Sequence, residues 1–253
     1  MTKQHNKQSG FTLVELAIVM IIIGLLIGGI LKGQELIANA QTTATIAQIK
    51  GYDAAITTFR DKYNALPGDM SNPETRLSNC DAAPCNEGGN GLGTVGGDDS
   101  VIIAPDLENE GVVAFAHLAA ADLVSNVDPL GTLAYGSALP EAEFGGGFYM
   151  GYEDDAEIIN TAADGVRRGH YLIVTEVLPR AVLTNENADG VTAINAGRID
   201  RKLDDGNPLS GDVRSVGAEC VVDADPDAVP PTSASYAEAS NAATCVPLIR
   251  IQG

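Results

Sequence analysis

One carboxylate stands inside a long apolar segment near the start of the chain. From Phe11 to Leu31 there are 21 residues whose only polar side chains are Thr12 and Glu15. As a helix this segment would be about 31 Å long, enough to cross the hydrocarbon core of a bilayer. A charged side chain there costs about 2.5 kcal/mol or more, so Glu15 needs a partner of opposite charge. The alternative is a polar residue near a helix end that snorkels to the membrane surface.

The ten residues before this segment form a short basic leader. It contains Lys3 and Lys7 but no acid, which favours the cytoplasmic side of a membrane. A secretory signal peptide would have its cleavage site after the apolar segment, whereas the processing point here, Gly10-Phe11, precedes it. Cleavage at that point would keep the membrane helix in the mature chain.

The hexapeptide Gly10-Phe11-Thr12-Leu13-Val14-Glu15 resembles the processing signature of type IV pilins and type II secretion pseudopilins. The resemblance implies that a prepilin peptidase cleaves after Gly10 and that the new amino group of Phe11 is N-methylated before the subunit enters a helical filament. In such a filament, the Phe11 amine of one subunit and the Glu15 carboxylate of a neighbour would neutralise each other in an apolar core. Glu15 is therefore the expected assembly residue.

The chain has an even number of cysteines, all beyond the apolar segment, as expected for an oxidising compartment. They are Cys80, Cys85, Cys220 and Cys245. Three pairings are possible, and because short loops close most easily we predict disulfides Cys80–Cys85 and Cys220–Cys245. A zinc site is the less favoured alternative for the first pair, since no second Cys or His pair stands at zinc-finger spacing. A C-terminal loop closed by a disulfide also resembles the pilins.

Four acidic residues in the C-terminal half are candidate ligands for Ca2+. Asp200 and Asp204 would share a helix face, Asp205-Gly206 would end that helix, and Asp212 could fold back beside them. Converging carboxylates suit Ca2+, which takes about six to eight oxygen ligands. The alternative is ordinary turn chemistry, with basic neighbours pairing the acids. Some pseudopilins bind calcium in the head, so Ca2+ is the one cofactor that the sequence suggests.

Charge and motif content argue against two other functional classes. Residues 65–253 carry 30 acidic and 9 basic side chains, a balance of −21, whereas nucleic-acid binding requires cationic side chains. Only His117 and His170 lie beyond the leader, and no nucleophile-elbow, zinc-protease or dinucleotide motif is present. We therefore expect neither an enzyme nor a nucleic-acid partner, and we interpret His117 as structural.

The elements that would position these residues predict an α+β fold. No proline precedes Pro67, so one long helix is expected over 11–64, with 11–31 in the membrane and 32–64 packed on the head. Its packing face carries five large side chains spaced three and four apart: Ile49, Tyr52, Ile56, Phe59 and Tyr63. Residues 65–253 are expected to form an acidic globular head, in which a small, largely antiparallel sheet covers the helix.

Within the head, the residue pattern predicts two more helices, over 108–124 and 187–203, and three strands, over 146–152, 170–178 and 213–222. A glycine-rich stretch at 88–97 lacks the Lys-Ser/Thr of a phosphate loop. We expect this stretch to be a flexible surface loop.

Both the motif and the expected fold favour a structural subunit of a type IV pilus-like filament or of a type II secretion pseudopilus. The precursor would cross the inner membrane once with its head in the periplasm, and after assembly the head would lie in a periplasmic pseudopilus or an extracellular pilus. Its expected partners are prepilin peptidase, other pilin or pseudopilin subunits, and an inner-membrane assembly platform. The helix lacks the proline that many type IV pilins and major pseudopilins carry, and this absence together with the acidic head favours a pseudopilin or a minor pilin-like component. The alternative is a tip-located minor pilin whose head is a ligand-binding or adhesive module.

Overall fold

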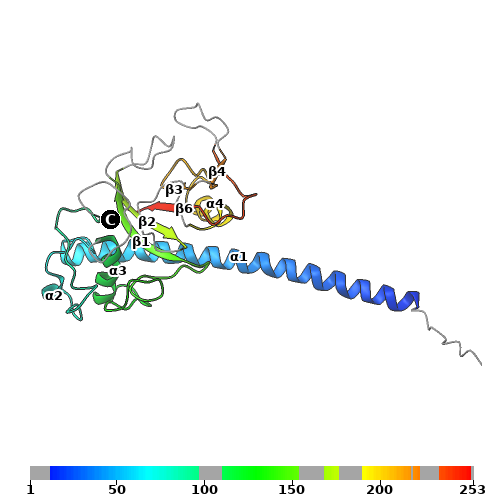
Figure 1. Ribbon diagram of the computed structural model, residues 1–253, viewed down its shortest axis with the longest axis horizontal. Coiled ribbons are helices and arrows are strands. Elements are labelled where there is room, and N and C mark those ends of the chain that lie inside the picture. The colour runs from blue at the N-terminus through cyan, green and yellow to red at the C-terminus, as the bar shows by residue number, and fades with distance from the viewer. Residues whose placement is uncertain are drawn as a thin grey trace, which may run out of the picture. The chain divides into compact units, whose positions relative to one another are not determined.

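The computed structural model describes residues 12–96, 110–153, 168–176, 190–217, 219–222 and 234–251. The chain divides into two compact units, Met1–Gln41 and Thr42–Gly253. One continuous helix, α1 (Leu13–Tyr63), has 51 residues and begins in the first unit (Figure 1). The absence of proline from this stretch allows the helix to run without a break.

In the second unit, α1 presents one buried face to the rest of the fold. Buried positions on the helix begin at Thr42, and the predicted stripe of large side chains is confirmed: Ile49, Tyr52, Ile56 and Phe59 are buried and Tyr63 is partly buried. The Tyr52 ring packs edge to face on the rings of Phe115 and Phe148, with ring centroids 5.2 Å and 5.3 Å apart. The core therefore lies where α1 meets the helix and strand that carry these two rings.

That helix is α3 (Glu110–Ala120), which packs against the first strand of the sheet. The sequence predicted a helix over 108–124, but α3 ends four residues earlier. Asp122 has φ 58°, a left-handed conformation that does not continue a right-handed helix. Positions 108 and 109 lie outside the described residues. A short helix, α2 (Pro73–Arg76), lies in the segment between α1 and α3.

A four-stranded antiparallel sheet forms the other layer of this unit, which confirms the predicted α+β class (Figure 1). In spatial order its strands are β1 (Gly147–Glu153), β2 (Gly169–Thr175), β6 (Val246–Arg250) and β3 (Val213–Val216). A second, two-stranded sheet pairs β4 (Val221–Val222) with β5 (Ser235–Tyr236). Helix α4 (Ala193–Leu203) contacts β3 and β5.

Several predicted element boundaries are wrong. The strand expected over 213–222 divides into β3 and β4, because the chain turns at Gly217, where φ is 139° and a Cβ would lie 1.8 Å from the Thr244 carbonyl oxygen. The helix expected from 187 starts at Ala193, since Val191 pairs with Cys245 and the Thr192 hydroxyl caps the helix. Positions 177–178 and 187–189 lie outside the described residues.

Strand β6 was not predicted, although it occupies an inner position of the sheet. Its sequence contains Pro247, which cannot donate a backbone hydrogen bond and argues against an inner strand. In the structure, Pro247 is opposite Ser215 of β3, and the pairing of β6 with β2 stops one residue short of the proline, at Leu248. Pro247 therefore lies outside the ladder with β2, where its lack of an N–H costs no hydrogen bond.

Candidate functional site

The two residues of the predicted cleavage junction, Gly10 and Phe11, lie outside the described residues, which begin at Thr12. The Glu15 carboxylate, four positions after the junction, accepts hydrogen bonds from the Thr12 backbone N–H at 2.9 Å and from the Thr12 hydroxyl at 2.8 Å. In return, the Glu15 N–H donates to the Thr12 hydroxyl at 3.3 Å. This reciprocal arrangement is a capping box, which satisfies polar groups that the first turn of a helix leaves without partners.

This local role of Glu15 was not predicted from the sequence. Thr12-Leu13-Val14-Glu15 has the Thr-x-x-Glu spacing of a capping box, so the signal is present in the sequence. Within a single chain, Oε2 of the Glu15 carboxylate therefore has two hydrogen-bond partners, both from Thr12. A negative side chain in the first turn also interacts favourably with the helix dipole.

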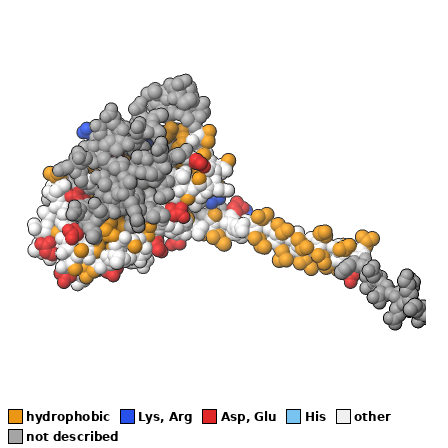
Figure 2. Space-filling view, in the orientation of Figure 1, with side chains coloured by type: hydrophobic (Ala, Val, Ile, Leu, Met, Phe, Trp, Pro, Cys, Tyr) orange, Lys and Arg blue, Asp and Glu red, His pale blue; other side chains and the backbone are white. Residues whose placement is uncertain are grey.

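After this cap, large exposed hydrophobic side chains cover the first part of α1 (Figure 2). Leu13 is 87% exposed and Leu25 is 74% exposed. Four glycines on this stretch have no atom within 4 Å of their Cβ positions outside the local helix: Gly24, Gly28, Gly29 and Gly33. Among the described helices, α1 is the one long and apolar enough to cross a membrane. Such a surface requires lipid or other apolar helices around it.

Both cysteine pairs predicted from loop closure are joined in the structure. Cys80 is bonded to Cys85 with a Cα–Cα distance of 5.0 Å, and Cys220 is bonded to Cys245 with a Cα–Cα distance of 4.9 Å. All four cysteines are buried. The second disulfide closes a loop that contains β4 and β5, and Cys245 directly precedes β6.

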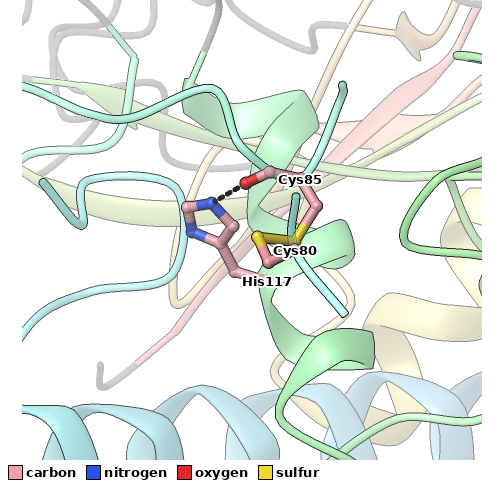
Figure 3. A group of neighbouring side chains, drawn as sticks. All are labelled: Cys80, Cys85 and His117. Atoms are coloured by element: carbon pink, nitrogen blue, oxygen red, sulfur yellow. Dashed lines mark hydrogen bonds between the residues drawn. A yellow bond between two sulfur atoms is a disulfide. The ribbon is translucent and has the colours of Figure 1, made fainter. Parts of the chain in front are cut away.

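His117 connects the first disulfide loop to the turn that follows α1, and Figure 3 shows its bond to Cys85 in that disulfide loop. Its Nδ1 accepts a hydrogen bond from the Gly68 N–H at 2.9 Å, so Nε2 carries the proton and donates to the Cys85 carbonyl oxygen at 2.9 Å. Burial lowers the pKa of His117 to about 4, although the bonds to the backbone of Cys85 and Glu87 oppose the shift. With both nitrogens bonded and both neighbouring sulfurs in a disulfide, this group is a structural link and not a zinc site.

Two buried carboxylates hold the glycine-rich loop that the sequence predicted to be flexible. Asp69 accepts hydrogen bonds at 2.6 to 3.1 Å from three consecutive backbone N–H groups, those of Gly91, Leu92 and Gly93. Glu110 accepts from the N–H groups of Asn90 at 2.8 Å and Gly96 at 3.1 Å. The loop is exposed at 91–93, as expected, but it is anchored at both ends by charge-assisted hydrogen bonds.

Of the four predicted Ca2+ ligands, the structure gathers three. Carboxylate oxygens of Asp200, Asp204 and Asp205 lie within 4.8 Å of one another, and Asp200 is fully buried. The Asp212 carboxylate instead lies 3.8 Å from Arg250, while its backbone N–H donates to Asp204. The three gathered acids are the oxygen donors that Ca2+ prefers, but they also accept hydrogen bonds from their own loop. Ca2+ binding by these residues stays a prediction.

Asp200 is also part of a buried chain of hydrogen bonds. The Tyr236 hydroxyl donates to Asp200 at 2.8 Å, and the Ser215 hydroxyl lies 3.0 Å from that of Tyr236. The Gly206 N–H donates to the other Asp200 oxygen at 3.1 Å. Burial raises the pKa of Asp200 to about 6, the hydrogen bonds oppose the shift, and the nearby Asp204 and Asp205 add to it.

This raised pKa predicts that ionised Asp200 destabilises the fold. The folded chain holds the Asp200 proton more tightly than the unfolded chain. The protonated carboxyl group therefore makes its full contribution to stability below pH 4, and this contribution is lost as the pH rises through 6, by on the order of 2 kcal/mol. Asp200→Asn should remove this loss, so that its stability relative to wild type increases between pH 4 and 7. Thermal unfolding of the full chain in nonionic detergent with EDTA, followed by near-ultraviolet circular dichroism, measures this difference.

Asp61→Asn is the matched control, because Asp61 is exposed on α1. It should change the pH dependence little. Equal pH dependence in Asp200→Asn and Asp61→Asn would contradict the raised pKa. The amide introduced by Asp200→Asn has a single carbonyl oxygen and accepts from only one of the two donors. A constant offset in stability is therefore expected, and the slope with pH is the informative quantity.

Comparison with known proteins identifies the N-terminal segment. Residues 5–31 match the family model of the prokaryotic N-terminal methylation motif, which is the signature of prepilin-type proteins such as type IV pilins and pseudopilins. The chain therefore carries the N-terminal signature of a prepilin-type protein, and its long apolar helix and small antiparallel sheet form a pilin-like arrangement. No curated protein and no solved structure was found to match the chain.

Proposed function

We propose that this chain is a subunit of a type IV pilus-like filament or of a type II secretion pseudopilus. The observation that carries the proposal is the methylation motif at residues 5–31, together with the exposed apolar helix that follows it. A helix covered by large hydrophobic side chains is stable in a membrane or in a bundle of like helices, and assembly transfers it from the first environment to the second. The head then needs no catalytic group to perform its function.

In this proposal the leader, residues 1–10, is removed by prepilin peptidase and the amino group of Phe11 is methylated. Residues 11–31 anchor the precursor in the inner membrane, and the acidic head over 65–253 lies in the periplasm. The basic leader supports this orientation, because Lys3 and Lys7 favour the cytoplasmic side. An inner-membrane assembly platform and other pilin or pseudopilin subunits are the proposed partners.

Maturation provides the direct test. Mass spectrometry of the chain extracted from membranes of cells that contain a prepilin peptidase should show a methylated Phe11 as the first residue. Gly10→Ala should still be processed to a large extent, whereas the bulkier Gly10→Val should accumulate as the full-length precursor. An intact Met1 terminus in the wild-type chain, or equal processing of Gly10→Val and wild type, would refute the proposal.

A further inference from the structure

A cavity of about 490 Å³ opens where the end of α1, the turn after it, the glycine-rich loop and the start of β2 meet. Its polar lining includes Arg60, Asn64, Asp69, Arg76 and His170. This volume is within the range of about 300 to 1,000 Å³ that is typical of small-molecule sites. None of these residues belongs to the methylation motif, the disulfides or the acidic cluster.

The cavity is cationic although the head as a whole is strongly acidic. The Arg60 guanidinium makes no ion pair or hydrogen bond with the described residues, and Arg76 donates to the Tyr63 carbonyl oxygen at the end of α1. The Asp69 carboxylate already accepts three N–H groups of the glycine-rich loop. Two guanidinium groups and one carboxylate therefore leave a local charge of about +1.

His170 forms part of the wall of the same cavity. The residue is only 8% exposed and lines the cavity, while its Nε2 is buried and has no hydrogen-bond partner among the described residues. Burial lowers the pKa of His170 to about 4, Asp69 opposes this shift and Arg60 adds to it, so the ring is neutral at pH 7. Because Nε2 itself is buried, a ligand in the cavity would contact the accessible part of the ring and not this nitrogen.

We propose that this cavity binds a small carboxylate, with its carboxylate group between Arg60 and Arg76 and its body against the His170 ring. The planar guanidinium forks match a carboxylate, and a single negative charge balances the local charge of about +1. Inorganic phosphate, which carries more negative charge at pH 7, fits less well because Asp69 lies in the same wall. The binding does not depend on filament assembly, and it would give the head a ligand-binding role in addition to a structural one.

Histidine resonances provide a specific probe of binding, because the whole chain has only three histidines. The full chain, labelled with ring 15N-histidine in nonionic detergent at pH 7, would be titrated with D-glucuronate at constant ionic strength. The His170 ring nitrogens should shift in a saturable manner. The His117 ring, whose two nitrogens are already bonded, should not shift and reports that the head is folded.

Substitutions on α1 separate specific binding from a general charge effect. Arg60→Gln should weaken glucuronate binding about tenfold, because a charge-assisted contact is lost, and Arg60→Lys should fall between Arg60→Gln and wild type. Lys50→Gln is the matched control: it removes the same charge from an exposed position on the same helix and should leave the affinity unchanged. If the His117 signal shows that Arg60→Gln is misfolded, the comparison of Arg60→Lys with Lys50→Gln decides.

Four results would overturn the proposal. The first is a His170 shift that does not saturate, and the second is equal weakening by Arg60→Gln and Lys50→Gln. The third is equal binding of D-glucose, which would show that the carboxylate is not recognised. The fourth is tighter binding of inorganic phosphate than of glucuronate, which would assign the cavity to a more highly charged anion. The maturation of Phe11 is measured separately, so a negative result here leaves the filament proposal intact.

Discussion

Glu15→Ala is expected to be processed and inserted into the membrane but to enter filaments at least about a hundredfold less efficiently than wild type. In the proposed filament, the Phe11 amine of one subunit lies in an apolar core and needs the Glu15 carboxylate of its neighbour. Removing one partner of a buried ion pair typically costs about 3 to 5 kcal/mol, which is more than a hundredfold at each addition step. The measurement is the amount of sheared or cross-linked filament from cells in which the variant is the only copy.

The capping box at the start of α1 makes Glu15→Gln the decisive companion variant. Glutamine can accept the hydrogen bond from the Thr12 N–H, as glutamate does, so it preserves the cap and the shape of the side chain while removing the charge. If the charge pair drives assembly, Glu15→Gln should assemble as poorly as Glu15→Ala. If the cap is the important feature, Glu15→Gln should assemble like wild type.

Thr12→Val serves as the matched control for the cap. It removes the hydroxyl that bonds to Glu15 but keeps the carboxylate and a side chain of similar shape. Under the charge-pair mechanism it should assemble much better than either Glu15 variant. Wild-type assembly by both Glu15 variants would reject the mechanism and leave Glu15 as a capping residue. An intact head, shown by protease resistance and by oxidised cysteines, is required in every variant.

The helix and the sheet follow from patterns that operate over short distances along the chain. The spacing of Ile49, Tyr52, Ile56 and Phe59 predicts one buried face, and all four are buried. Strands β1 and β2 were predicted because aromatic and β-branched residues are concentrated between turn residues. Strand β6 was missed because Pro247 opposes that assignment locally, and its tolerance depends on which neighbour the proline faces.

The polar contacts of the head depend on residues that are distant in the sequence, so residue patterns could not predict them. Asp69 accepts hydrogen bonds from N–H groups 22 to 24 positions later, and His117 bonds to Gly68 across 49 positions. The sequence marks the cysteine pairs because loop closure favours near neighbours, but it does not mark which backbone groups a buried imidazole will reach. The cavity likewise joins Arg60 of α1 to His170 of β2, which are far apart along the chain.

His117→Leu is expected to destabilise the head by about 2 to 4 kcal/mol. Leucine fills a similar volume but leaves the Gly68 N–H and the Cys85 carbonyl oxygen without partners in a buried site, and each such loss costs about 1 to 3 kcal/mol. His170→Leu is the matched control, because it removes a buried imidazole whose Nε2 has no partner among the described residues. Thermal or chemical unfolding of the full chain in nonionic detergent measures both effects.

The same variant tests the lowered pKa of His117. A buried neutral histidine contributes its full stability above its unfolded pKa of about 6.5, and this contribution is lost as the pH falls through the folded pKa of about 4. Between pH 7 and 5, protonation of this group alone should lower the free energy of unfolding of wild type by about 2 kcal/mol. The free energy of unfolding of His117→Leu should fall by about 2 kcal/mol less than that of wild type over the same range. If His117→Leu proved as stable as wild type at pH 7, or no less stable than His170→Leu, the two hydrogen bonds would not be holding the disulfide loop to the turn after α1. An unchanged acid sensitivity would show that His117 is protonated in the folded chain at pH 5.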